Sequence, residues 1–157
     1  MDEFEKFYLQ AIRFLSYRPR SAFEVKENLT KKKASPQIIE TVVLRLTQQK
    51  FLNDEEFTKW FVMQRIRFAH KSMQLIKLEL KQKGISREII ESAFINQESG
   101  KETDLEQAKK LVLKKLQKYI SFPKQEMYQK LGRVLAAKGF NWDIIKHAID
   151  EVLAKEV

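Results

Sequence analysis

The chain has 157 residues, of which 43% are hydrophobic and 11% aromatic, and this content is enough to build a core and argues against a disordered chain. It contains no cysteine, which excludes a disulfide framework, a thiolate nucleophile and a cysteine-ligated zinc site. The formal net charge of +9 favours a polyanionic partner.

The beginning of the chain, Met1-Asp2-Glu3-Phe4-Glu5, is acidic where a signal peptide would be basic and then apolar. The sequence also has no apolar run of the length that a transmembrane helix needs. We therefore expect a cytoplasmic protein without a membrane partner.

A segment recurs three times without a gap, at Ala22–Val43, Met73–Phe94 and Tyr128–Ile149. Each copy holds a leucine before a basic turn, then a polar residue, then an aliphatic doublet. The leucines are Leu29, Leu80 and Leu135, the polar residues are Ser35, Ser86 and Asn141, and the doublets are Ile38-Ile39, Ile89-Ile90 and Ile144-Ile145. This periodicity predicts a repeat architecture in which these apolar residues are buried at equivalent places.

Capping signals divide each repeat into three helices, because serine, threonine, asparagine and aspartate accept hydrogen bonds from the first N–H groups of a helix. The predicted starts, in chain order, are Asp2, Ser21, Ser35, Asn53, Ser72, Ser86, Thr103, Ser121–Pro123 and Asn141. Gly84 and Gly139 lie just past the middle helices, where a left-handed residue is expected, and Lys33 takes that place in the first copy.

The sequence thus predicts an all-α fold of nine helices, with no strand pattern competing. We expect three tandem three-helix repeats, at residues 1–52, 53–99 and 100–157, which stack into an elongated, curved, solenoid-like array. The predicted linkers are residues 48–53 and 96–103. The second is the most polar and least periodic stretch, and we expect a hinge there.

Catalytic and metal motifs are absent from the sequence. His70 and His147 are far apart, and neither has partners in a known ligand pattern. No glycine-rich phosphate loop, GxSxG or HExxH motif is present. We expect no catalytic residue, no metal, no cofactor and no enzyme activity.

Basic side chains give a clearer indication of function than the catalytic motifs do. Lys110, Lys114 and Lys118 recur every four residues and face away from the apolar stripe of their predicted helix, so they form a row that fits phosphates or a plain solvated face equally well. A second group surrounds the end of a helix in the central repeat and the start of the next helix: Arg65, Arg67, His70, Lys71, Lys77 and Lys81. An anion-binding role for this group competes with local ion pairs, such as one from Arg65 to Glu55 or Glu56.

Aromatic side chains raise a base-stacking hypothesis. Most of them fall on helical apolar stripes, which favours a core role, and Trp142 at the start of its helix is the main exception.

Three segments of the chain form a recognisable pattern: Phe51-Leu52-Asn53-Asp54-Glu55-Glu56-Phe57 with Phe61-Val62 and Arg65, then Ile76–Ile85 (IKLELKQKGI), and near the beginning Ala11–Ser21 (AIRFLSYRPRS). The first two resemble the central signature of the RecX family of RecA regulators, and the third resembles that family's first repeat. The loop Phe68–Met73 departs from the glycine- and proline-bearing loop common in the family. The resemblance implies a non-enzymatic regulator of DNA repair and recombination in the SOS response, and we expect a monomer. It also implies binding to the RecA filament on single-stranded DNA, inhibition of its extension, ATP hydrolysis and strand exchange, and weak, salt-dependent, sequence-independent affinity for single-stranded DNA.

Two other functions stay open at this point. One is an independent helical DNA-binding module that uses the turn Lys83–Ser86 in a helix-turn-helix. Its recognition helix would be Ser86–Phe94 (SREIIESAF), which offers one arginine and two glutamates and is a poor match to a phosphate-lined groove. The other is a peptide-binding helical solenoid, which would not need a charge of +9.

Overall fold

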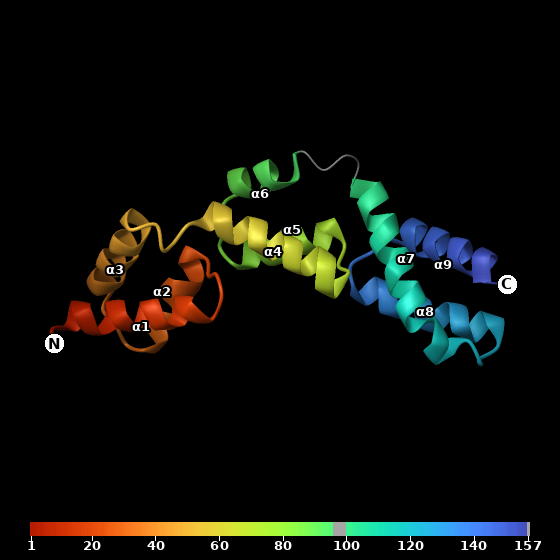
Figure 1. Ribbon diagram of the computed structural model, residues 1–157, viewed down its shortest axis with the longest axis horizontal. Helices are drawn as coiled ribbons and strands as arrows, with labels where there is room; N and C mark the ends of the chain where they lie inside the picture. Colours follow the sequence, from red (N-terminus) through yellow and green to blue (C-terminus); the bar gives the residue numbers. More distant parts are fainter. Residues whose placement is uncertain (96–99, 157) are drawn as a thin grey trace. The chain divides into compact units, whose positions relative to one another are not determined.

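The computed structural model describes residues 1–95 and 100–156, and for residues 100–102 and 156 it describes the backbone alone. These residues form nine helices and no strand, so the all-α prediction is confirmed (Figure 1). The helices are α1 (Glu3–Tyr17), α2 (Ala22–Lys31), α3 (Pro36–Gln48), α4 (Asp54–Ala69), α5 (Met73–Gln82), α6 (Arg87–Phe94), α7 (Gly100–Tyr119), α8 (Lys124–Ala137) and α9 (Trp142–Glu156). None of these nine is both long and apolar enough to cross a bilayer.

The predicted capping residues begin most of the helices. Ser21 and Glu24 form a complete capping box at α2, and the Asn53 side chain accepts from the N–H groups of Glu55 and Glu56 at 2.9 and 3.1 Å. Side-chain caps also begin α1, α3, α5, α6 and α9, at Asp2, Ser35, Ser72, Ser86 and Asn141. Short-range chemistry is therefore sufficient to place these starts.

Two starts in the third repeat differ from this pattern. Helix α7 begins at Gly100, so the predicted start at Thr103 was wrong by about one turn. Helix α8 begins at Lys124 after Pro123, which gives no side-chain cap. Residues 96–99, which are half of the predicted linker and hinge at 96–103, lie outside the described residues.

The turn after each middle helix has the same backbone geometry. Lys33, Gly84 and Gly139 have φ angles of 69°, 77° and 90°, as predicted for residues that end a helix in the left-handed region. In each turn the next N–H donates back to the carbonyl of the recurring leucine: Ala34 to Leu29 and Ile85 to Leu80 at 3.1 Å, and Phe140 to Leu135 at 3.3 Å. The repeat is thus visible in hydrogen bonds as well as in sequence.

The contacts divide the chain into two compact units. Unit 1 comprises residues 1–61 and 79–93, and unit 2 comprises residues 62–78 together with the described part of 94–157. The boundary passes through α4 and α5, so each unit holds one terminal repeat and part of the central one. The division into repeats at 1–52, 53–99 and 100–157 follows the sequence instead and stays a prediction.

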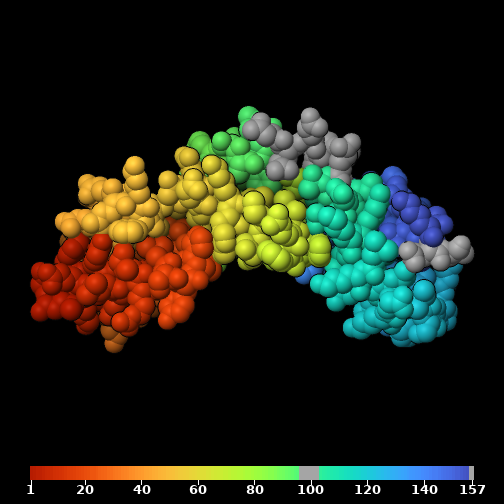
Figure 2. Space-filling model, viewed as in Figure 1, coloured from red at the N-terminus to blue at the C-terminus, as the bar shows by residue number. Residues whose placement is uncertain are grey.

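Each unit has its own apolar core. In unit 1 the core lies among α1, α2 and α3 and includes the fully buried Leu29; α3 lies beside α1 in the space-filling view (Figure 2). In unit 2 it lies among α7, α8 and α9 and includes Leu135 and Ile145. Leu80 is also fully buried, so the prediction for the three leucines is confirmed.

The prediction for the aliphatic doublets was only partly correct. Ile39, Ile144 and Ile145 are buried, whereas Ile38, Ile89 and Ile90 are half-buried. Successive residues on a helix point about 100° apart, because a turn holds 3.6 residues. A doublet therefore places both side chains in a core only where neighbouring helices cover a wide arc, as α7 and α8 do for α9.

Two joints of the same design tie neighbouring repeats together, one inside each unit. In joint 1 the N–H of Ala22 donates to Asp54 at 2.8 Å, and the hydroxyl of Ser21 donates to the carbonyl of Lys83 at 2.8 Å. In joint 2 the N–H of Met73 donates to Asp104 at 3.0 Å, and the N–H of Ser72 donates to the carbonyl of Lys138 at 2.9 Å.

In both joints the start of a middle helix meets two parts of the following repeat: a carboxylate of its first helix and the glycine turn that ends its middle helix. A side chain on Gly84 would lie 2.4 Å from Cβ of Phe23, and one on Gly139 would lie 2.5 Å from Oγ of Ser72. The two glycines are therefore required by close approach as well as by their φ angles.

Candidate nucleic-acid interface

The central basic group lies where α4 ends. Arg67 is exposed on the last turn of α4, while Arg65 and Lys71 are half-buried. The N–H of Lys71 donates to the carbonyl of Arg65 at 3.3 Å, which closes the loop back onto the helix. His70 has a φ of 50° and so adopts the left-handed conformation that reverses the chain direction there.

His70 is a positioning residue in this loop. Its ring Nδ1 lies 2.9 Å from Oε1 of Gln107, a buried side chain of α7. Together with joint 2, this contact holds the loop 70–73 against α7 and the turn after α8. The sequence analysis grouped His70 with the anion ligands, and the structure gives it a partner inside unit 2.

Asp104 is a residue of joint 2 that the sequence analysis did not select. Burial raises the pKa of its carboxyl group above the ordinary value, against the lowering effects of the hydrogen bond from the Met73 N–H and of the Lys77 ammonium. A signal was present in the sequence, because Asp54 and Asp104 each directly follow the predicted start of the first helix of their repeat, Asn53 and Thr103. Only the structure relates those carboxylates to the helix starts that they cap.

The predicted lysine row is exposed along one face of α7. Lys110, Lys114 and Lys118 are all exposed, while Ala108, Leu111, Val112 and Leu116 of the same helix are buried in the core of unit 2. Each step of four residues rises about 6 Å along the helix. Lys109, which the sequence analysis did not select, is bonded to Glu151 of α9, so that cation is already neutralised within unit 2.

The last two predicted residues fall on α5. Lys77 is exposed in unit 2, where its Nζ lies 5.0 Å from the centre of the Phe94 ring. Lys81 is exposed in unit 1. Eight of the nine predicted residues thus belong to unit 2, and the contact between His70 and Gln107 places the loop after α4 against α7, one turn before Lys110.

The aromatic side chains follow the core interpretation in most cases. Phe7, Phe57 and Phe61 are buried. Trp142 is 62% exposed and Phe68 is 66% exposed, so the predicted exception at Trp142 is confirmed. Phe122, in the turn between α7 and α8, is also exposed and was not selected from the sequence.

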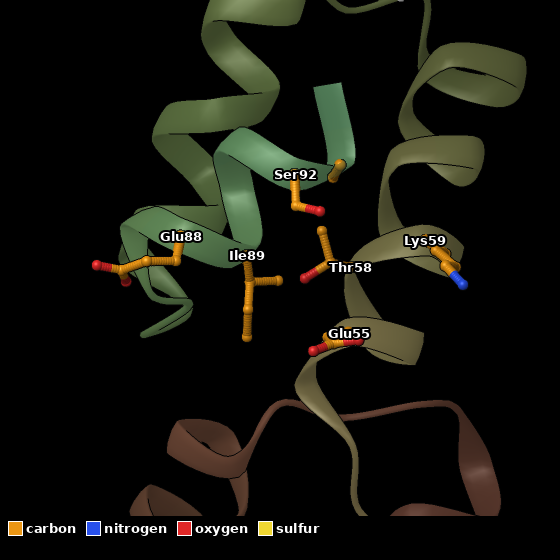
Figure 3. Close-up of a pocket in the computed structure, with 7 residues that line it drawn as sticks. Glu55, Thr58, Lys59, Glu88, Ile89 and Ser92 are labelled. Atoms are coloured by element: carbon orange, nitrogen blue, oxygen red, sulfur yellow. The ribbon is translucent and has the colours of Figure 1, made fainter. Parts of the chain in front are cut away.

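A surface groove lies between α4 and α6 in unit 1. Thr58, Ile89 and Ser92 point into it, with Glu55 at its edge, while Lys59 and Glu88 point away (Figure 3). Its volume is about 310 Å³. The carboxylate at the edge disfavours a phosphate ligand there, so the chemistry of the groove differs from that of the lysine row on α7.

Comparison with known proteins gives matches along most of the chain. The first, second and third three-helix domains of RecX match residues 8–46, 53–93 and 102–149. Curated relatives named Regulatory protein RecX, from Bacillus cytotoxicus and Bacillus subtilis, are 35% and 36% identical over 96% of the chain. The chain spans only about half the length of these relatives, 55% and 56%.

Solved structures give the same assignment. A crystal structure of RecX from Lactobacillus salivarius matches with a TM-score of 0.74 and 27% identity, over 96% of this chain and 97% of that one. A second crystal structure, of regulatory protein RecX, has the same score and identity over 95% of this chain and 72% of that one. Three matched domains in the expected order, with an all-α fold, show that the chain belongs to the RecX family.

Proposed function

We propose that this protein regulates homologous recombination and DNA repair by binding the RecA filament on single-stranded DNA. In this proposal it inhibits filament extension, ATP hydrolysis and strand exchange. The name of the curated relatives supports a regulatory role. The exposed lysine row of α7, opposite the core of unit 2, is the observation that carries the DNA-binding part.

The proposed contacts are the exposed basic side chains of unit 2. Arg67, Lys77, Lys110, Lys114 and Lys118 are exposed there and would neutralise phosphates without reading bases, so binding is weak, salt-dependent and independent of sequence. Arg65 and Lys71 are half-buried residues of the same unit, and His70 positions the loop that holds Lys71. Lys81 belongs to unit 1 and is proposed only as a separate exposed cation.

The proposed action is non-enzymatic and requires no cofactor. A monomer in the cytoplasm, acting during the SOS response, would inhibit RecA by occupying the assembled filament. The degree of inhibition then depends on the affinity for the filament, and this protein consumes no substrate or nucleotide of its own.

The third helix of the central repeat, α6, argues against the helix-turn-helix alternative. In α6 the side chain of Arg87 pairs with Glu91 at 2.8 Å, and Glu88 is exposed beside it. A helix that presents two carboxylates and a neutralised arginine would repel the phosphates that line a major groove.

The peptide-binding alternative has one supporting observation, the groove between α4 and α6 with Ile89 on its wall (Figure 3). It leaves the net charge of +9 without a role. We therefore keep it as the function to be considered if the protein has no effect on RecA.

The test is RecA-dependent ATP hydrolysis on single-stranded DNA at low salt, with increasing protein. The wild type should lower the rate. A triple variant, Lys110→Glu with Lys114→Glu and Lys118→Glu, should require a higher concentration for the same inhibition. The control is Lys59→Glu, a single charge reversal at an exposed lysine of unit 1, which should inhibit like the wild type. A wild-type protein in molar excess that leaves both ATP hydrolysis and strand exchange unchanged would refute the proposal.

A further inference from the structure

The turn between α7 and α8 combines exposed apolar groups with cations. Phe122 and Ile120 are 38% and 52% exposed, and the N–H of Phe122 donates to the carbonyl of Tyr119 at 3.1 Å, which fixes the turn. The centres of the Tyr119 and Phe122 rings lie 6.2 Å apart, with the ring planes 47° from parallel. Tyr119 in turn packs on the core of unit 2, so Phe122 stands on a rigid support.

Two ammonium groups lie against these rings. Nζ of Lys118 is 5.4 Å from the centre of the Tyr119 ring, and Nζ of Lys130 is 4.9 Å from the centre of the Phe122 ring. We call Lys118, Tyr119, Phe122 and Lys130 the corner cluster. Because Lys118 is also the last member of the exposed row on α7, the corner cluster lies at the end of a line of positive charge.

The combination restricts the chemistry of a ligand. A row of lysines alone would suit any polyanion, and an aromatic ring alone would suit any flat apolar group. A strand of nucleotides presents phosphates and flat bases together, and proteins bind single strands by combining a basic track with aromatic rings on which bases stack. Paired bases in a duplex are not available for such stacking, so the cluster fits a single strand.

We propose that the corner cluster is a base-stacking site for single-stranded nucleic acid, with Phe122 as the stacking surface. A strand that follows Lys110, Lys114 and Lys118 reaches the cluster as it leaves α7, and one base stacks on the exposed part of the Phe122 ring. Lys130 holds that ring from α8 and neutralises the next phosphate. This site rests on the proposed function, because it assumes that the lysine row contacts a single strand.

The experiment compares two probes by fluorescence anisotropy: a labelled oligothymidylate, and a strand of equal length whose sugars carry no bases. Phe122→Ala should weaken binding of the oligothymidylate by about 5- to 150-fold, the range expected for the loss of one stacked base. It should leave the slope of log K against log salt unchanged, because no cation is removed. The same variant should bind the base-free strand as the wild type does.

Three further variants distinguish the loss of a stacking surface from a general change in the protein. Phe122→Leu keeps an apolar side chain without a ring face and should behave like Phe122→Ala, with the helical circular dichroism spectrum intact in both. Phe122→Trp should restore binding of the oligothymidylate. Phe51→Ala, at a phenylalanine of unit 1 that is 57% exposed, is the matched control and should change nothing.

The outcomes separate this site from the function on which it rests. If Phe122→Ala binds the oligothymidylate like the wild type, or weakens both probes equally, the stacking site is refuted while salt-dependent DNA binding stands. If the wild type binds neither probe at low salt, DNA binding and the stacking site are both refuted. An aromatic corner that binds a protein partner would then be the remaining explanation.

Discussion

The backbone N–H of Met73 donates to the carboxylate of Asp104, 31 residues further along the chain, at 3.0 Å. Asp104 thus caps the start of a helix in the preceding repeat and not of its own. Ala22 and Asp54 repeat the relationship in unit 1 at 2.8 Å. The two joints therefore tie the stability of the first two middle helices, α2 and α5, to the repeat that follows each of them.

The first prediction concerns pH. Because burial raises the pKa of Asp104 in the folded chain, the folded chain binds more protons at this site than the unfolded chain does. The stability that this site contributes is therefore largest below the unfolded pKa of about 3.9 and is lost as the pH rises through the folded pKa. Asp104→Asn still offers an acceptor to Met73 and carries no charge. The free energy of unfolding of this variant, relative to that of the wild type, should therefore increase from acid to neutral pH.

Denaturant titrations of the two proteins at several pH values measure this difference. Asp104→Ala, which removes the acceptor, should lose about 1 kcal/mol at neutral pH. Glu106→Gln, at an exposed carboxylate of the same helix, is the control and should follow the wild type at every pH. A difference between Asp104→Asn and the wild type that shrinks with rising pH would show that the charged form stabilises the joint.

The second prediction concerns the glycine turns. Gly139→Ala should destabilise the protein by about 2 to 4 kcal/mol, because the new methyl group would overpack the joint and the residue keeps a positive φ. Gly132→Ala is the matched control: the nearest atom to its new methyl group would be 3.7 Å away, on Trp142, and the site is inside α8. It should be neutral or stabilise by up to about 1 kcal/mol. Equal effects of the two changes on the thermal midpoint would contradict the close approach at Gly139.

The third prediction concerns the recurring leucines. Leu80→Ala should cost about 2 to 5 kcal/mol in a denaturant titration, because the side chain is fully buried and leaves a cavity. Leu44→Ala, at a leucine that is 58% exposed, should cost much less. A loss below about 0.5 kcal/mol at Leu80 would mean that it does not belong to a core.

The fourth prediction concerns salt. If Lys110, Lys114 and Lys118 each contact a phosphate, replacing all three by glutamine should flatten the slope of log K against log salt by about 2, because each contact on a single strand contributes about 0.7. Lys59→Gln in unit 1 should leave the slope as it is. An unchanged slope in the triple variant would identify the row as an ordinary solvated face.

Much of the fold could be predicted because its causes are local. The side chains of Ser35, Asn53 and Asn141 begin helices through contacts within three residues, and the residues after Leu80 and Leu135 turn within five. The start of α7 could not be placed in this way. The capping box at Thr103 is a valid local signal, yet the helix already begins at Gly100. A side-chain cap is needed only at the first residues of a helix, so the signal at Thr103 does not mark the start.

The joints and the corner cluster lay beyond the reach of the sequence. Nothing in the spacing of Ser72 and Lys138 says that a helix start meets a turn 66 residues later. Phe122 is one aromatic residue among many, and its exposure depends on how α7 and α8 enclose Tyr119 and leave the ring beside it open. The basic row, by contrast, followed from helical spacing, because its residues share one element and one face.

The pairing of a serine with a glycine turn also bears on how such a chain grows over evolution. The middle copy takes part in both joints, with Ser72 directly before it and Gly84 at its turn, so a duplication of this stretch delivers both halves of a joint together. Ser21 and Ser72 meet Gly84 and Gly139 in this way, while Lys33 and Met127 stand at the two equivalent positions that belong to neither joint. Outside the joints the close approach that requires a glycine does not apply, and Lys33 keeps the same left-handed turn with a full side chain.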